Sequence, residues 1–160
     1  MANNYPLGFY FKLSFLDRSF KGEDPSFQEV SGISKELSVE EVACGGENRF
    51  KYRLPITSSS HNLVLKRALI PEGSKLLDWC VSCIDRGLAS KITTQDLTVS
   101  LINPDGTIGF SWTFYKAYPI KYSISDLKSQ ENALVVESIE LAYTYFEVTP
   151  DDSIFGNLFD

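Results

Sequence analysis

The sequence predicts a mainly β protein with one α-helix, arranged as a small barrel or sandwich. Apolar and polar residues alternate in most segments, which is the pattern of half-buried strands. Only one stretch has its apolar residues at helical spacing. Aromatic residues make up 13% of the chain, with 11 Phe, 8 Tyr and 2 Trp, and such residues favour strands. With about eight predicted strands, a barrel or sandwich buries the apolar faces economically.

Length and composition are those of one ordinary globular domain. The 160 residues suffice for about one domain. Hydrophobic residues make up 43% and charged residues 22%, which excludes a mostly disordered chain. We therefore expect a single domain over residues 1–160, with a core of about residues 9–148 and an acidic C-terminal extension over residues 149–160.

Charge and targeting signals narrow the functional classes. Lys and Arg number 15 against 21 Asp and Glu, which gives a net charge of −6. A groove that binds the nucleic acid backbone needs the opposite sign. The first residues lack the pattern of a signal peptide, and no apolar stretch approaches the ~20 residues of a membrane span. We expect synthesis in the cytoplasm, with reduced cysteines and no direct insertion into a membrane.

The first half of the chain alternates in several short strands. In residues 9–16, every second residue from Phe9 to Phe15 is apolar. A second strand over residues 27–30 ends in a bulge or bend at Ser31-Gly32, and residues 33–42 alternate more loosely. Residues 62–69 form a further strand with clear alternation.

A long loop is predicted between these strands, over residues 43–61. Two glycines, Pro55 and a run of three serines weaken the pattern there. Loops of this length inside a compact domain are uncommon and usually functional.

One helix is predicted over about Ser74–Arg86. The residues Pro71-Glu72-Gly73-Ser74 give a start signal, and Arg86-Gly87 closes the helix. The apolar stripe at helical spacing consists of Leu76, Leu77, Trp79, Cys80, Cys83 and Ile84.

The second half of the chain reads as long strands. A hairpin over residues 97–115 turns at Asn103-Pro104-Asp105-Gly106, and a separate strand follows a break near Ala117. The last strand is predicted as one run of about fifteen residues from 133 to 148. A straight strand of that length spans about 50 Å, whereas the radius of gyration of the chain is about 15 Å. We expect this strand to bend sharply or to project and pair with a neighbouring molecule, as in a ring or filament.

Residue types that carry catalysis have ordinary structural interpretations in this chain. Cys80 and Cys83 form a CxxC in the middle of the helix, where we expect packing thiols; a metal or redox role is the alternative. His61 follows a serine run and lacks the context that activates a nucleophile, so we expect an exposed loop histidine. Glu137 and Glu140 lie on opposite faces of one strand, which excludes a paired carboxylate. No catalytic, cofactor-binding or metal-binding residue is predicted.

Several motifs resemble, in order and spacing, those of phage tail tube proteins. The resemblance covers the chain from about residue 9 to residue 148, and it departs at Tyr118, where Trp is common, and in the acidic end after Thr149. The stretches that carry it are FQEVSGI (27–33), KYRLP (51–55), LVLKR (63–67), WTFYKAYP (112–119) and VESIEL (136–141).

The resemblance implies the inner tube of a contractile phage tail or of a phage-tail-like injection system, similar in fold to the type VI secretion tube protein. Such a protein assembles into hexameric rings stacked as a conduit for cargo or DNA, and needs no catalysis and no cofactor. The implied partners are further copies of the chain, a surrounding sheath protein, and baseplate and tube-terminator proteins. The alternatives are a tube-initiator or baseplate protein of the same fold, or a monomeric β-barrel that binds a ligand.

Two regions are the candidates for contacts between subunits and between rings. One is the loop with Lys51, Tyr52, Arg53 and Pro55, and the other is the hairpin turn with Asn103, Asp105 and Gly106. The alternative is that both are merely exposed turns.

Overall fold

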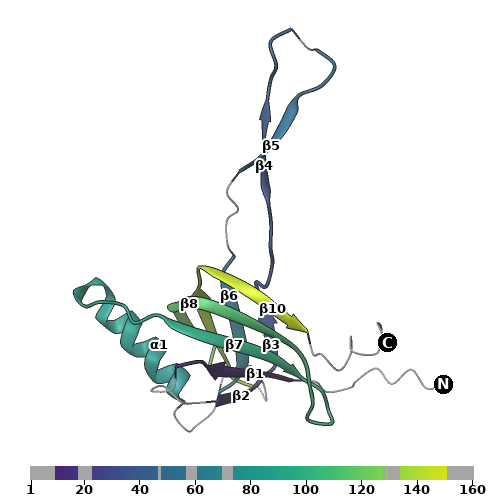
Figure 1. The fold of residues 1–160 in the computed structure, drawn as a ribbon. Coiled ribbons are helices and arrows are strands. Elements are labelled where there is room, and N and C mark those ends of the chain that lie inside the picture. Colours follow the sequence, from purple (N-terminus) through teal and green to yellow (C-terminus); the bar gives the residue numbers. More distant parts are fainter. Residues whose placement is uncertain are drawn as a thin grey trace, which may run out of the picture.

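The protein consists of a curved sheet, one helix at one side of it, and a two-stranded hairpin that projects away from both (Figure 1). The computed structural model describes residues 10–17, 23–46, 48–56, 61–69, 74–127, 129 and 134–150. The strands are β1 (Tyr10–Phe15), β2 (Glu23–Phe27), β3 (Glu29–Ser31), β4 (Ser38–Val42), β5 (Tyr52–Ile56), β6 (Leu63–Ala68), β7 (Gln95–Ile102), β8 (Ile108–Ile124), β9 (Val136–Ala142) and β10 (Tyr145–Pro150). The helix α1 (Lys75–Arg86) runs into a short 3₁₀ turn, Gly87–Ala89.

The main sheet is antiparallel and is organised by the long strand β8. Neighbouring strands follow the order β2-β1-β7-β8-β9-β6-β3, and β10 pairs with β8 beside this path. The first half of β8 lies between β7 and β10, and its second half pairs with β9. The end strands β2 and β3 are separated in sequence only by Gln28, whose N–H donates to the carbonyl oxygen of Lys66 at 3.0 Å. The sheet curls around a core, but its ladders do not close into a complete barrel.

The alternation of the sequence places the core as predicted. In β1, Leu13 and Phe15 point inward, and in β6 the residues Leu63, Leu65 and Arg67 are buried while their neighbours are half-buried. Phe9, the first member of the predicted β1 pattern, lies outside the described residues. The core residues, which come from every long strand and from α1, are Leu13, Phe15, Phe27, Leu63, Leu65, Leu76, Trp79, Cys80, Leu97, Val99, Phe114, Ala117, Ile139, Leu141, Tyr143 and Phe146.

The helix begins and ends where the sequence predicts. Ser74 is the N-cap, and its Oγ accepts a hydrogen bond from the backbone N–H of Leu77 at 3.0 Å. The stripe residues Leu76, Trp79 and Cys80 are buried, and Trp79 packs edge-on against Phe15 with ring centroids 5.7 Å apart. The helix therefore covers the open end of the curled sheet with its apolar face.

The predicted fifteen-residue final strand is wrong, because the chain turns at Tyr143-Thr144 and forms two strands. β9 pairs with β6 and with the second half of β8, whereas β10 pairs with the first half of β8. The strand thus stays within the molecule. Tyr143 is buried against Phe114 and Phe146 at this corner. Continuous alternation conceals such a corner because the apolar residues keep facing the core on both sides of it.

The predicted break near Ala117 is a bulge and not a strand end. β8 continues through it as one strand, and Lys116 has a φ of 52°, with its N–H donating to Oδ1 of Asp96 at 2.8 Å. The pairing with β7 shifts register at this point. The sequence shows the irregularity, but a single residue of positive φ re-aims a strand without ending it.

The predicted loop over residues 43–61 is also wrong in part, because residues 52–56 form β5. β5 pairs with β4 in a separate two-stranded sheet, with Val42 opposite Tyr52 and Ser38 opposite Ile56. Pro55 obscured this strand in the sequence, yet proline is tolerated at a sheet edge. The projecting strands of the molecule are therefore those of this hairpin and not the final strand (Figure 1).

A buried ion pair ties the sheet to the helix. Arg67 on β6 and Glu137 on β9 are both 1% exposed, and Nε of Arg67 donates to Oε1 of Glu137. Nη2 of Arg67 also donates to Oγ of Ser74 at 3.0 Å, and the hydroxyl of Tyr122 donates to Oε2 of Glu137 at 3.1 Å. Burial and the nearby charge of Glu137 raise the pKa of Tyr122. Glu140 lies on the other face of β9, as the sequence predicts.

Candidate assembly surfaces

The β4–β5 hairpin presents an apolar face that no described part of the chain covers. The register places Val42, Tyr52, Leu54 and Ile56 on one face, together with Ser38 and Glu40. Tyr52 and Leu54 are each 51% exposed and Ile56 is 44% exposed. Phe50 extends this surface by packing edge-on against Tyr52, with ring centroids 5.4 Å apart. We call the side chains of Val42, Tyr52, Leu54 and Ile56 the apolar face of the hairpin.

The opposite face of the hairpin is more polar. Arg53 lies across from Glu41, and Pro55 lies across from Val39. Of the predicted contact residues, Tyr52 thus lies on the apolar face of β5, whereas Arg53 and Pro55 lie on the opposite face. All three are exposed, and exposed Lys51 precedes the strand. The hairpin presents two different surfaces to any neighbour.

The hairpin leaves and rejoins the body at one narrow point. Gly32, at the predicted bend, has a φ of +87°, and a Cβ atom added there would lie 1.8 Å from the carbonyl oxygen of Asn62. Only glycine fits both the conformation and the space. Next to this point, Nε2 of His61 lies 3.3 Å from Oε2 of Glu36, and both side chains are exposed. The prediction of an exposed histidine is confirmed.

The turn between β7 and β8 is short, exposed and internally hydrogen-bonded. The N–H of Gly106 donates to the carbonyl of Asn103 at 2.9 Å, and the N–H of Asn103 donates to the carbonyl of Thr107 at 2.8 Å. The carboxylate of Asp105 accepts from Oγ1 of Thr107 at 2.6 Å and from its N–H at 2.9 Å. These bonds, the hydroxyl first, hold the pKa of Asp105 below its usual value. The turn therefore presents a fixed negative charge.

The two groups of predicted contact residues do not come together. Asn103, Asp105 and Gly106 lie at the end of the β7–β8 strands that is far from α1, whereas Lys51 to Pro55 lie on the projecting hairpin (Figure 1). Each of the two groups can therefore contact a different neighbouring molecule, and both contacts can form at the same time.

A third surface, missed in the sequence, is the outer face of the sheet made by β1, β7, β8 and β10. The register aligns Ser14, Thr98, Thr113 and Glu147 in one row across the four strands. It aligns a second row that consists of Lys12, Ser100, Ser111 and Thr149. We call these eight side chains the hydroxyl face.

The hydroxyl face is ordered by its own contacts. The hydroxyls of Ser100 and Ser111 lie 3.0 Å apart, and those of Thr98 and Thr113 lie 3.2 Å apart. The sequence shows polar residues at every second position in residues 97–101 and 110–114, which indicates a polar face. Their alignment in rows depends on the strand register, which the sequence does not show.

Three strands of the main sheet have one partner each. Within the described residues, β2 pairs with β1 alone, β3 with β6 alone and β10 with β8 alone. Such edges carry backbone donors and acceptors that are open to a further strand.

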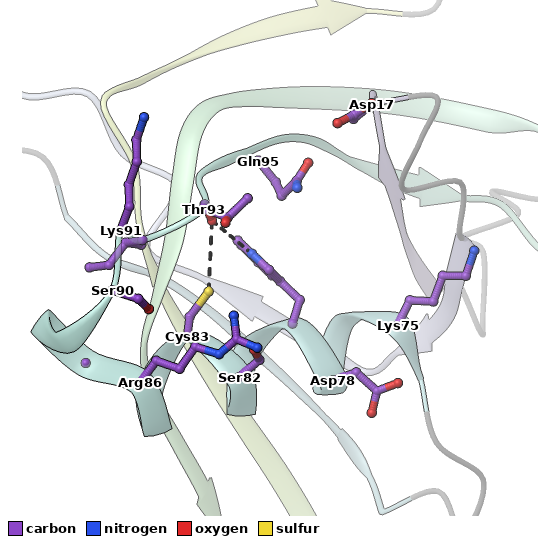
Figure 2. A pocket seen from close by; sticks show the side chains of 13 residues that line it. Asp17, Lys75, Asp78, Ser82, Cys83, Arg86, Ser90, Lys91, Thr93 and Gln95 are labelled. Carbon is purple, nitrogen blue, oxygen red and sulfur yellow. Dashed lines mark hydrogen bonds between the residues drawn. The ribbon is translucent and has the colours of Figure 1, made fainter.

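A pocket lies between α1 and the segment that leads into β7 (Figure 2). Its volume is about 650 Å³, and the indole of Trp79 forms part of its wall while donating from Nε1 to the carbonyl of Thr93 at 3.0 Å. Cys83 also lines it, whereas Cys80 is fully buried in the core. Neither thiol is part of a disulfide, and Cys83 packs against the core that contains Cys80, which agrees with the expectation of packing cysteines.

The described residues contain no group of three metal-ligating side chains and no helix long and apolar enough to cross a membrane.

Comparisons with known proteins agree with this picture. A family model described as T4-like virus tail tube protein gp19 matches residues 7–147. No curated protein matches the sequence.

Among solved structures, a chain from the baseplate of the anti-feeding prophage, determined with 6-fold symmetry, has 25% identity and a TM-score of 0.72, over 90% of this chain and 95% of that chain. A chain from the sheath–tube complex of the extracellular contractile injection system PVC has the same identity and TM-score, over 92% of this chain and 94% of that chain. Hcp1 from Flavobacterium johnsoniae shares the fold alone, with 12% identity and a TM-score of 0.54 over 88% of this chain and 95% of that chain.

The family match spans most of the described fold, including the helix, the main sheet and the hairpin. This chain therefore belongs to the T4-like tail tube protein family, and it is a structural protein and not an enzyme.

Proposed function

We propose that this protein is the repeating subunit of the inner tube of a contractile injection system or phage tail, assembled as hexameric rings that stack into a conduit. One observation carries the proposal: the apolar face of the β4–β5 hairpin is uncovered in the single chain.

The hairpin needs a neighbour for its stability. An isolated two-stranded hairpin is marginally stable in water, and this one projects from the body without a core of its own. Burial of Tyr52, Leu54 or Ile56 against another chain would contribute about 1.5–3 kcal/mol each at full burial. We expect a second copy of the chain to cover this face, because every copy in a tube carries the same uncovered apolar face.

Two of the open strand edges support a ring. If β10 of one copy lies beside the β2 edge of the next, the sheets of successive copies join into one continuous wall, and both of these edges are paired. A head-to-tail contact of this kind closes into a ring when the rotation between copies divides a full turn.

The hydroxyl face would line the interior of such a ring. Its two rows contain four serine or threonine hydroxyls paired with one another, two further hydroxyls, one lysine and one glutamate, and no apolar side chain. A polar wall whose hydroxyls already bond to each other offers little adhesion to a passing molecule. Such a lining suits a conduit for protein cargo or DNA.

The relatives suggest the remaining partners. The PVC relative comes from a complex of sheath and tube, and a further relative with 25% identity comes from its sheath and tube terminator. We infer a surrounding sheath protein, and baseplate and terminator proteins at the two ends of the tube. We infer that the protein is synthesised in the cytoplasm and acts as a part of the assembled particle.

A tube initiator is the second candidate, because another relative comes from a baseplate. An initiator starts a tube but does not extend it. The two functions therefore differ in whether the purified protein alone forms long tubes or only single rings.

Electron microscopy and sedimentation velocity of the purified protein test the proposal. Rings that stack into tubes at raised concentration support the tube subunit, and rings that never stack support the initiator. A monomer of 18.0 kDa at all concentrations contradicts both and favours a ligand-binding module.

A further inference from the structure

The pocket beside α1 contains a polar side chain that can bond an occupant. The side chain of Gln95 lines it and is only 6% exposed, and its amide makes no hydrogen bond within the described residues. No side-chain N or O atom of the described residues is both buried and unpartnered, so water reaches this amide through the pocket and an occupant could take the place of that water. The amide is complementary to a peptide group, which also has one donor and one acceptor.

Two exposed basic side chains lie at one side of this pocket. Arg86 and Lys91 lie on one side of the pocket, and neither forms an ion pair with another described residue. Figure 2 shows them across the pocket from Lys75 and Asp78, with Gln95 between the two groups. An occupant that places a carboxylate near Arg86 and Lys91 would satisfy the charges on that side.

The molecule carries a segment with matching chemistry at its far end. The Asn103–Thr107 turn is exposed and held by its own hydrogen bonds, and it presents the carboxylate of Asp105. The hydrogen bonds from Thr107 lower the pKa of Asp105, which favours the charged carboxylate. A rigid turn loses little conformational entropy when it binds.

One molecule cannot bring these two features together. The pocket adjoins Gln95, where β7 begins, and the turn follows Ile102, where β7 ends. Eight residues of strand hold them about 26 Å apart. A contact between the two features therefore needs a second copy, stacked head to tail on the first along the direction of these strands.

We propose that the Asn103–Thr107 turn of a second copy docks into the pocket beside α1, with Asp105 facing Arg86 and Lys91 and a peptide group of the turn bonded to Gln95. This inference rests on the proposed function, since it names the contact that joins one ring to the next. It explains why the turn and the pocket lie at opposite ends of the same strands.

A charge exchange tests the contact. Asp105→Lys, and separately the double variant Arg86→Glu with Lys91→Glu, place like charges together and are expected to reduce the fraction of protein in tubes about tenfold or more. Rings are expected to persist, because the ring edges are elsewhere. The variant with all three substitutions restores opposite charges and is expected to recover tubes. Asp126→Lys, an exposed acid outside both features, is the matched control.

The outcomes separate this inference from the proposed function. If the unmodified protein forms no rings, the proposed function fails. If it forms tubes that all four variants also form at the same concentration, the docking contact is wrong while the tube subunit stands. If the charge variants lose their tubes but the triple variant does not recover them, the pairing of Asp105 with Arg86 and Lys91 is wrong. Circular dichroism checks that each variant is folded.

Discussion

The two long hairpins of this protein have opposite relations to its core. β7 and β8 place Leu97, Val99 and Phe114 inside the core, and their outward hydroxyls bond to each other. β4 and β5 bury no large apolar side chain in the described part of the chain, although Leu54 and Ile56 are apolar. One hairpin is packed within the molecule, whereas the apolar face of the other is uncovered in the described part of the chain. Under the proposed function, the first hairpin serves folding and the second serves assembly.

The largest expected effect is on the stability of the main sheet and its helix, without the β4–β5 hairpin. Glu137→Ala leaves the buried guanidinium of Arg67 without its carboxylate, and we expect the free energy of unfolding to fall by about 3–5 kcal/mol. Chemical denaturation of the monomer measures it. Glu140→Ala, on the outer face of the same strand, is the matched control and is expected to cost less than about 1 kcal/mol. Equal losses for the two variants would show that the buried pair has no special role.

The next effect is at the junction between the two regions. Gly32→Ala forces a positive φ on a residue with a Cβ, which costs about 1–3 kcal/mol, and the overlap with the backbone of Asn62 adds to it. We expect a lower melting temperature together with weaker assembly, because the base of the hairpin must move. Gly46→Ala, which has a positive φ but open space around it, separates the two causes. Identical behaviour of both variants would mean that the close approach to Asn62 is unimportant.

A third change affects assembly but not folding. Leu54→Ser removes an apolar side chain that is 51% exposed in the single chain, so we expect monomer stability to change by no more than about 0.5 kcal/mol. Assembly is expected to weaken by about 2 kcal/mol per contact, since that side chain would be buried by a neighbour. Sedimentation across a concentration series measures it.

The opposite face of the same strand provides the comparison for Leu54. Arg53→Ser, directly adjacent in sequence, is expected to have the smaller effect on assembly, because an exposed polar contact contributes about 0–1 kcal/mol. The reverse order would assign the contact to the polar face.

The smallest effect is at the helix start. Ser74→Ala removes the N-cap and one hydrogen bond to Arg67, and we expect a loss of about 1 kcal/mol. Thermal unfolding checks it. Since α1 belongs to the body, ring formation at low temperature is expected to remain unchanged.

Much of the fold could be predicted because its signals are local. The N-cap at Ser74, the stripe through Trp79 and Cys80, and the alternation in β1 and β6 depend only on near neighbours in sequence. The corner at Tyr143-Thr144 and strand β5 were missed, because both depend on pairing with distant segments. For the final segment, the sequence left a sharp bend or a projection open; the structure shows the bend, and the hairpin that projects is β4–β5.

The candidate surfaces could likewise be predicted only where their signals are local in sequence. Tyr52 and Asp105 could be selected from motifs and turn chemistry, but whether Tyr52 shares a face with Leu54 and Ile56 depends on the register of β5. The hydroxyl face and the pocket at Gln95 join residues from separate elements, and no short sequence pattern marks such a combination.

Hydrogen exchange at the backbone amides of Tyr52, Arg53, Leu54 and Ile56, compared between dilute monomer and assembled protein, tests the central claim most directly. We predict rapid exchange in the monomer and strong protection after assembly, while the amides of β7 are protected in both states. Equal exchange in β5 before and after assembly would show that no neighbouring copy covers the hairpin, and the account would be wrong.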